Sequence, residues 1–217
     1  MQRYIQLCFL FLIIFSLYSC LRSKTEYHVN GVVKSEVGYK GKKEHGIAIY
    51  YRTDGTRELE VNMKNGKKEG KMTRWFNDGH KVEYEANYKN DLLDGAEILY
   101  DRKGFKTMET HYKEGKKHGY YASWHNRDAL KEEGHFWNDW YDGEWHYYDF
   151  RGFPVGEAFF EKGSGEQIAY DTYGHLMQIT SYKENKKNGK EILFSPQGDT
   201  LSITVFENDR IIEKREF

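Results

Sequence analysis

Proline and cysteine are almost absent from this chain of 217 residues, which contains two of each. One cysteine, Cys8, lies in an apolar N-terminal stretch, and the other, Cys20, follows directly after that stretch. If both serve an export signal, the mature chain keeps no pair of thiols for a disulfide. The scarcity therefore excludes the small disulfide-stapled scaffolds, and the fold itself must supply the stability.

Net charge is also nearly absent, because 33 Lys and Arg residues face 34 Asp and Glu residues. Nucleic-acid binding needs a concentrated basic face, and no such stretch is visible, so nucleic acid is not an expected partner. Aromatic residues are abundant instead, at 17%, and include 18 Tyr. A disordered chain would lack these rings, whereas they suit a half-exposed β-sheet, where one ring face packs and the hydroxyl stays in water.

The first twenty residues resemble a bacterial lipoprotein signal peptide. Arg3 precedes an apolar run, residues 7–18, which has the length of a signal-peptide core and is short for a membrane span. The run ends in Leu17-Tyr18-Ser19-Cys20, which resembles a lipobox, whose cysteine is lipidated and becomes the mature N-terminus. The alternative is an uncleaved anchor, since residues 5–21 are almost continuously apolar. Both interpretations attach the chain to a membrane by its N-terminus.

We therefore expect a signal peptide at residues 1–19, a short polar tether at residues 20–26 that begins with the lipidation site Cys20, and one repeat domain at residues 27–217. Leu21 after the cysteine, rather than Asp, favours the outer membrane over the inner one, by analogy with enteric bacteria. The predicted location is the bacterial cell envelope, where the lipid-anchored chain faces the periplasm or the cell surface.

One phrase recurs along most of the chain. Residues 112–119 read YKEGKKHG, residues 63–70 read MKNGKKEG and residues 182–189 read YKENKKNG. Repeats start every 24 or 25 residues, except for one step of 22, at Tyr39, Met63, Tyr88, Tyr112, Phe136, Phe160 and Tyr182. A glycine follows seven positions later, at Gly46, Gly70, Gly95, Gly119, Gly143 and Gly189, and Gly165 is expected in that role in the short unit. A fixed period indicates a repeat architecture rather than a globular core.

An aromatic residue also lies twelve positions after most starts, and we expect these rings to form a ladder along one face. The ladder residues are Tyr51, Trp75, Tyr100, Trp124, Tyr148, Tyr170 and Phe194. Turn dipeptides such as Asn65-Gly66 separate stretches in which apolar and polar residues alternate, such as residues 58–63. The pattern predicts an all-β fold, an elongated antiparallel meander sheet of about seven 24-residue β-hairpin repeats with roughly fifteen strands.

The glycine phrases resemble MORN-type repeats, in which an aromatic residue, glycines, a second aromatic residue and a closing glycine follow one another. Residues 65–70 and 114–119 carry the resemblance best, and the unit length is similar to that of the bacterial YwqK-family antitoxin-like variant. The resemblance covers residues 27–217 and implies an elongated, twisted sheet with a scaffold or binding role and no catalysis. The unit at residues 160–181 departs from the pattern, because Gly163-Ser164-Gly165 replaces the lysine turn, which leaves its register open and could bend the sheet.

Candidate catalytic and metal chemistry is weak. His111 and His135 share a register in adjacent repeats, but such positions lie about 9.6 Å apart, too far for one zinc ion with bonds near 2 Å. No serine lies in a Gly-x-Ser-x-Gly context. Gly163-Ser164-Gly165 is too short for a phosphate-binding loop and follows no strand-to-helix pattern. Carboxylate pairs, Glu132 with Glu133 or Asp139 with Asp142, are the only basis for an enzyme such as a glycosidase. We expect no catalysis, no metal and no cofactor.

Two surface features are candidates for binding. Lysine pairs recur at Lys42-Lys43, Lys67-Lys68, Lys116-Lys117 and Lys186-Lys187. They could contact anionic lipid or an acidic partner, or they could only keep an edge of the sheet solvated. The solvated edge is the preferred interpretation, because Glu and Asp crowd the same region. The other feature is an excess of rings that the ladder does not need, at Trp137, Trp140, Trp145 and Tyr147. These four are the candidate binding site, and extra packing is the alternative.

Together these patterns predict a non-enzymatic, membrane-anchored repeat scaffold that binds a protein or an envelope component. The alternative is an antitoxin or immunity-like protein that neutralises a toxin by direct binding.

Overall fold

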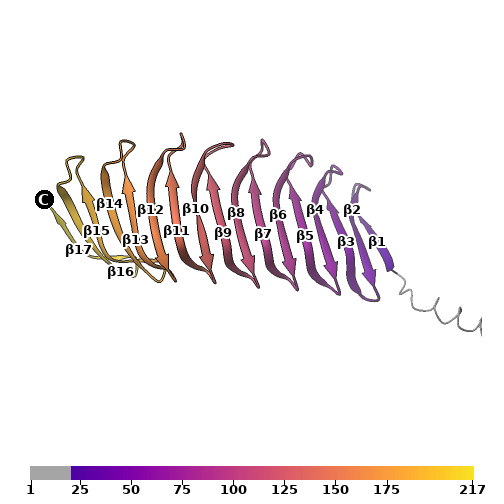
Figure 1. Cartoon of the computed structure of the whole chain (residues 1–217). Coiled ribbons are helices and arrows are strands. Elements are labelled where there is room, and N and C mark those ends of the chain that lie inside the picture. The colour runs from indigo at the N-terminus through magenta and orange to yellow at the C-terminus, as the bar shows by residue number, and fades with distance from the viewer. Residues whose placement is uncertain (1–20) are drawn as a thin grey trace, which may run out of the picture.

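The computed structural model describes residues 21–217, which form a single antiparallel sheet of 17 strands (Figure 1). The strands are β1 (Leu21–Tyr27), β2 (Val33–Lys40), β3 (Lys43–Tyr51), β4 (Arg57–Lys64), β5 (Lys67–Trp75), β6 (Val82–Lys89), β7 (Leu92–Tyr100), β8 (Lys106–Lys113), β9 (Lys116–Trp124), β10 (Leu130–Trp137), β11 (Trp140–Tyr148), β12 (Pro154–Glu161), β13 (Ser164–Tyr170), β14 (Leu176–Lys183), β15 (Lys186–Phe194), β16 (Thr200–Glu207) and β17 (Arg210–Glu216).

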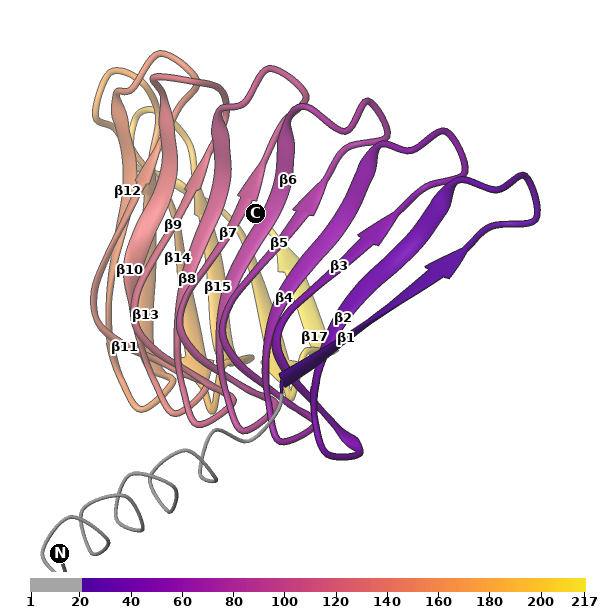
Figure 2. The ribbon, with the colours of Figure 1, turned by 90° about the vertical axis from the view of Figure 1, so that its right-hand side faces the viewer.

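Every strand pairs with the next one along the chain, so the connectivity is an uninterrupted meander. Figure 2, seen from the β1 end, shows that successive strands are rotated relative to one another, which is the usual twist of a sheet. The predicted all-β meander of hairpin repeats is confirmed. Residues 21–217 include no helix that is long and apolar enough to cross a membrane.

The two long edges of the sheet differ in their connections. One, here called the turn edge, is made of two-residue turns such as Asn65-Gly66, whose φ angles of 55° and 83° need residues that tolerate the left-handed region. The other, the loop edge, is made of loops such as residues 52–56. Turns at this edge bond to the hairpin before them: Asp139 N donates to Lys117 O at 2.9 Å and Gly163 N donates to Tyr141 O at 2.7 Å. The repeats therefore stabilise their neighbours, as in other stacked arrays.

The recurring glycine of the full-length repeats lies at a β-bulge. Gly70, Gly119 and Gly189 have φ angles of 98°, 99° and 105°, and the register of their hairpins shifts next to them. In the short unit β12 and β13 stay in continuous register, so the two missing residues are the bulge itself. The prediction that Gly165 takes the glycine role is wrong, since it pairs directly with Phe160 and its φ is not in the left-handed region.

The segment predicted as a tether is mostly the first strand. Leu21 pairs with Lys40 and Thr25 pairs with Glu36, so backbone hydrogen bonds to β2 order a sequence that has no apolar side to bury. Both outermost strands, β1 and β17, are exposed throughout and carry ion pairs along the strand, for example Lys24–Glu26 at 2.7 Å. Charged edge strands resist pairing with other chains. The predicted signal peptide at residues 1–19 and the lipidation site Cys20 lie outside the described residues.

The strand register places most of the buried residues on one face, here called the core face. They include Val37, Ala48, Val61, Ala86, Thr110, Trp145 and Ala158. This face is a single layer of side chains, and no second layer of the described chain covers it. The opposite face carries the recurring carboxylates and is described next.

Candidate binding surface

A row of glutamates runs along the face opposite the core, here called the glutamate face. Its members are Glu36, Glu60, Glu85, Glu109, Glu133 and Glu157, one on each even-numbered strand from β2 to β12. The pairing register connects each of them to the next through one residue of the intervening strand, such as Ile98 between Glu85 and Glu109. Sequence reasoning missed this row, although a carboxylate every 24 or 25 residues was a readable signal.

The rings of the predicted aromatic ladder lie beside this glutamate row, and several of them hydrogen-bond to it. Each ladder residue is the last residue of an odd-numbered strand, on the glutamate face and at the loop edge. The Tyr51 hydroxyl donates to Glu36 at 2.8 Å, that of Tyr148 to Glu133 at 3.0 Å and that of Tyr170 to Glu157 at 3.0 Å. Burial first, and then the Glu133 carboxylate, raises the pKa of Tyr148. Four ladder tyrosines, with Tyr100 bonding Glu85 at 3.3 Å, thus hold the carboxylates in place.

Where the ladder residue has no hydroxyl, the glutamate finds another partner or is missing. Beside Trp75, Glu60 lies 3.5 Å from Arg57. Beside Trp124, Glu109 accepts from Lys106 at 2.6 Å and contacts His111 at 2.9 Å. Beside Phe194 the corresponding strand position is Ile179, so ring and row change together.

Toward the C-terminal end the row becomes apolar. Ile168, Ile179, Ile192 and Ile203 are consecutive cross-strand neighbours on β13 to β16, and all are half-buried. The glutamate face therefore changes from acidic to apolar between β12 and β13. A binding partner would meet both chemistries at this boundary.

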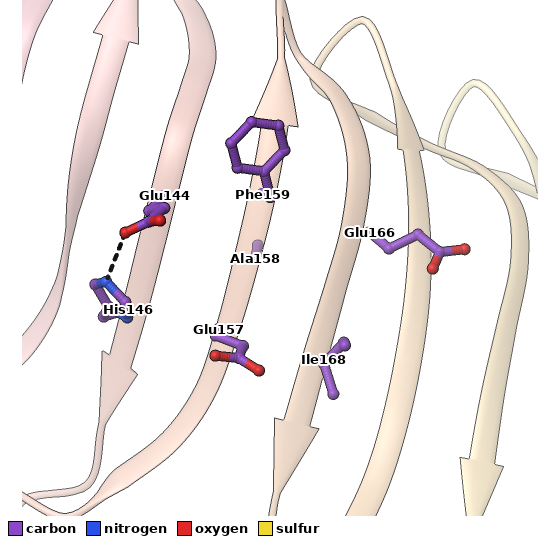
Figure 3. A pocket seen from close by; sticks show the side chains of 7 residues that line it. All are labelled: Glu144, His146, Glu157, Ala158, Phe159, Glu166 and Ile168. Atoms are coloured by element: carbon purple, nitrogen blue, oxygen red, sulfur yellow. Dashed lines mark ion pairs between the residues drawn. The ribbon is translucent and has the colours of Figure 1, made fainter.

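A hollow of about 510 Å³ opens at this boundary (Figure 3). It is lined by Glu144, His146, Glu157, Ala158, Phe159, Glu166 and Ile168 from β11, β12 and β13. Phe159 lies between Glu144 and Glu166 in the register and is 65% exposed. Within the described residues, no Lys or Arg nitrogen lies within 4.0 Å of the three carboxylates. The one basic side chain in contact with them is His146, 3.8 Å from Glu144. The hollow combines unneutralised negative charge with an exposed ring.

The structure divides the four predicted binding residues into an exposed pair and a pair that packs in the core. Trp137 and Trp140 face each other across the β10–β11 turn and are 50% and 36% exposed. Trp145, in contrast, is 2% exposed, so it is not available to a partner, and the prediction that it belongs to a binding surface is wrong. Tyr147 packs beside it at the margin of the same cluster, where burial raises its pKa. For Trp145 and Tyr147 the alternative of extra packing is the correct interpretation.

Trp145 is the centre of an aromatic cluster on the core face. Phe136, Tyr121 and Tyr141 surround it with ring centroids 5.2, 5.5 and 4.9 Å away. The indole fits because its neighbour on β10 is Gly134, where an added Cβ would lie 2.2 Å from the ring. The indole nitrogen donates to His135 O at 3.2 Å, so its only polar atom is satisfied.

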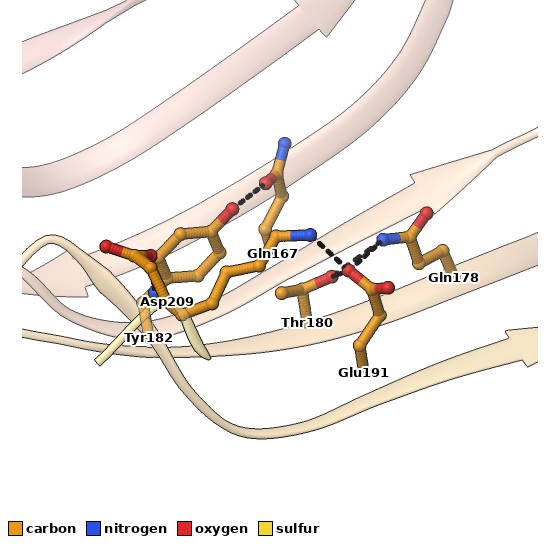
Figure 4. Close-up of polar contacts among 7 residues, drawn as sticks. Gln167, Gln178, Thr180, Tyr182, Glu191 and Asp209 are labelled. Carbon is orange, nitrogen blue, oxygen red and sulfur yellow. Dashed lines mark hydrogen bonds and ion pairs between the residues drawn. The ribbon is translucent and has the colours of Figure 1, made fainter. Parts of the chain in front are cut away.

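A polar network takes the place of this cluster near the C-terminal end (Figure 4). Glu191 accepts from Gln178 at 3.0 Å and from Thr180 at 3.4 Å, and it pairs with Lys187. Tyr182 donates to Gln167 at 3.1 Å. The core face is therefore apolar in the middle of the array and hydrogen-bonded toward its end.

The predicted catalytic and metal candidates are not brought together. Glu132 and Glu133 lie on opposite faces of β10, since Glu132 accepts from Tyr121 on the core face and Glu133 accepts from Tyr148. The His111 and His135 rings are separated by Tyr120, which lies 6.3 and 5.9 Å from them. In residues 21–217 no group of three potential ligands is arranged to hold a metal ion.

Asp139 and Asp142 have separate structural roles, as acceptors for the backbone amides of Lys117 and Lys162.

Comparison of the sequence with models of protein families and with curated proteins finds no match to either.

Proposed function

We propose that this chain is a non-enzymatic, membrane-anchored repeat scaffold of the cell envelope that binds a protein through the hollow around Phe159. The observation that carries the proposal is the combination, in one hollow, of an exposed ring with three carboxylates that no Lys or Arg of residues 21–217 neutralises. Exposed aromatic residues next to polar groups are typical of interface centres. The partner that fits is a protein that presents Lys or Arg side chains beside an apolar one.

The neighbouring surface supports the same partner. The isoleucine row continues the apolar part of the hollow across β13 to β16, while the glutamate row continues its acidic part back to β2. Tyrosine hydroxyls fix several of these carboxylates, so a partner would meet them pre-oriented and would spend little entropy in ordering them. A toxin neutralised by direct binding would be one such partner, and a MORN-type scaffold role is consistent with this surface.

The test is crosslinking of the full chain in its native membrane, followed by identification of the captured protein. Phe159→Ala and Glu157→Lys should each abolish capture, because they remove the exposed ring and reverse a charge of the hollow. Phe153→Ala is the matched control, since Phe153 is also exposed, at 54%, but lies in a loop outside the hollow. Capture that is the same in all three variants would contradict the proposed site. Capture of a polysaccharide rather than a protein would contradict the proposed partner class.

A further inference from the structure

The turn edge carries lysines that the fold places against one another. In four hairpins the last cross-strand pair before the turn joins two lysines: Lys40 with Lys43, Lys64 with Lys67, Lys113 with Lys116 and Lys183 with Lys186. All eight are exposed, and within the described residues only Lys64 has a carboxylate within 4.0 Å, that of Glu69 at 3.5 Å. Like charges directly opposite each other destabilise a sheet. An anionic surface would relieve this repulsion.

These lysines differ from their neighbours in the same phrases. Lys68, Lys117 and Lys187 lie over the rings of Tyr88, Phe136 and Phe206 at 4.7, 4.9 and 4.9 Å, so they serve packing within the sheet. The register also shows that Lys43, and not Lys42, corresponds to Lys67 and Lys116. The outward row is thus one lysine per strand end, and each is free of such packing.

Exposed apolar side chains interrupt this row at equivalent positions. Leu92, opposite Lys89, is 51% exposed, and the next turn but one carries the facing pair Trp137 and Trp140. Trp137 rests on the His118 ring at 4.4 Å, which holds it at the edge rather than in the core. Tryptophan with lysine nearby is the composition of segments that lie at a lipid–water interface.

The start of the described chain lies at the same edge. Leu21, 64% exposed, pairs with Lys40 at the first turn, so β1 begins at the turn edge, the lower edge in Figure 1. The last residue, Phe217, bonds to Leu201 O at 3.0 Å and therefore lies at the loop edge. A lipid on Cys20, one residue before Leu21, would hold the turn edge toward the bilayer. At the strand-end positions of this row the acidic residues, Glu161 and Glu207, lie in the C-terminal half, away from β1, whereas Asp91 and Glu114 lie in the turns of the first half.

We propose that the turn edge lies on an anionic lipid surface, with the lysine pairs against headgroup phosphates and Trp137 and Trp140 in the interface. The inference rests on the proposed membrane anchor and adds an orientation to it. The sheet then stands on its edge, and strands of up to nine residues hold the loop edge about 30 Å from the bilayer. The glutamate face stays open to a partner. An acidic protein on the same lysines is the competing occupant, and the experiment separates the two.

The experiment uses the full chain, isolated from membranes and reconstituted into phosphatidylcholine vesicles with or without phosphatidylglycerol, with brominated acyl chains as quenchers of tryptophan emission. We expect quenching in the anionic vesicles, and we expect Trp137→Phe with Trp140→Phe to remove most of it. Trp75→Phe with Trp124→Phe is the matched control, because both rings lie at the loop edge, and quenching should persist. Equal quenching in the two double variants would overturn the proposal.

The second part of the experiment reverses the charge of lysines at each edge. Lys67→Glu with Lys116→Glu should lower quenching in anionic vesicles to its value in neutral vesicles, whereas Lys103→Glu with Lys131→Glu, at the loop edge, should leave it unchanged. Lysine-dependent capture of an acidic protein without quenching would overturn the lipid assignment. Sedimentation of the unaltered chain with membranes measures the anchor separately, so a chain that stays in the supernatant contradicts the proposed function, and a sedimenting chain without quenching contradicts only the orientation.

Discussion

At the scale of single residues, Gly134 and Trp145 show how a core forms around a single buried indole. Gly134→Ala would place a methyl group 2.2 Å from the indole, which the surrounding rings hold in place. We expect a loss of about 1–3 kcal/mol in the free energy of unfolding, which is typical of overpacking. Urea unfolding of the variant measures it.

The matched test is the double variant with Trp145→Phe, whose smaller ring leaves room for the methyl group. The two substitutions together should cost clearly less than the sum of their separate costs, because the clash that one creates is relieved by the other. Additive costs would show that Gly134 is needed for a reason other than the indole.

At Thr110 we expect a substitution to have the opposite effect, a gain in the free energy of unfolding. It is 1% exposed, and its hydroxyl oxygen has no hydrogen-bond partner among the described residues. The same register position on β4 is Val61, so valine is compatible with the site. Thr110→Val should raise the free energy of unfolding by about 1 kcal/mol, since it removes an unpaired buried polar group and keeps the shape. Thr204→Val, at a register-equivalent position, provides a comparison. A destabilised Thr110→Val would contradict the prediction and would show that the Thr110 hydroxyl is hydrogen-bonded in solution.

At the scale of elements, the short unit is closed by a side chain from the next hairpin. Asn185 accepts from Tyr141 N at 2.9 Å and donates to Asp139 O at 2.8 Å, so its side chain spans the β12–β13 turn. Asn185→Gly keeps a residue that tolerates the φ of 61° but removes both bonds. We expect a loss of about 1–3 kcal/mol in unfolding free energy. The control is Asn90→Gly, because Asn90 has a similar φ of 51° and its own side chain makes no hydrogen bond among the described residues. This substitution should cost much less, and equal costs would contradict the bridging role.

The elements also show which features the sequence can predict. Strands, turns and the aromatic ladder follow from short-range alternation and from a fixed period, so they were predictable. The burial of Trp145 was not, because it depends on Gly134, which the chain brings beside it from another strand. Loss of the bulge between β12 and β13 becomes visible only in the strand pairing. β1 forms because its backbone hydrogen-bonds to β2, and no pattern among the residues of β1 indicates a strand. The glutamate row is present in the sequence as a carboxylate every 24 or 25 residues, but which face of the sheet carries it follows only from the strand pairing.

At the scale of the whole molecule, the sheet separates its tasks by face and by edge. The core face supplies packing, the glutamate face supplies the hollow, and the turn edge brings together β1 and the outward lysines. Tyrosines connect the first two of these, because they occur on both faces and donate to carboxylates on both. Tyr120 donates to Glu133 on the glutamate face at 3.1 Å, and Tyr121 donates to Glu132 on the core face at 3.0 Å.

This distribution predicts that the molecule unfolds in alkali. Burial first, and then the glutamate that each hydroxyl contacts, raises the pKa of Tyr120 and of Tyr121 from 10.0 to about 12. In the unfolded chain these phenols ionise near pH 10, and in the folded chain they ionise about two units higher, so the stability they contribute is complete below about pH 10 and is lost as the pH rises to about 12. Urea unfolding across this window, with tyrosinate absorbance as a second signal, measures the loss. Tyr121→Phe should flatten the dependence, because phenylalanine does not ionise; a free energy of unfolding that stays constant to pH 12 would mean that the hydroxyls are accessible to water. Since each hairpin is held mainly by its neighbours, ionisation at β9 should separate the array in the middle before its ends.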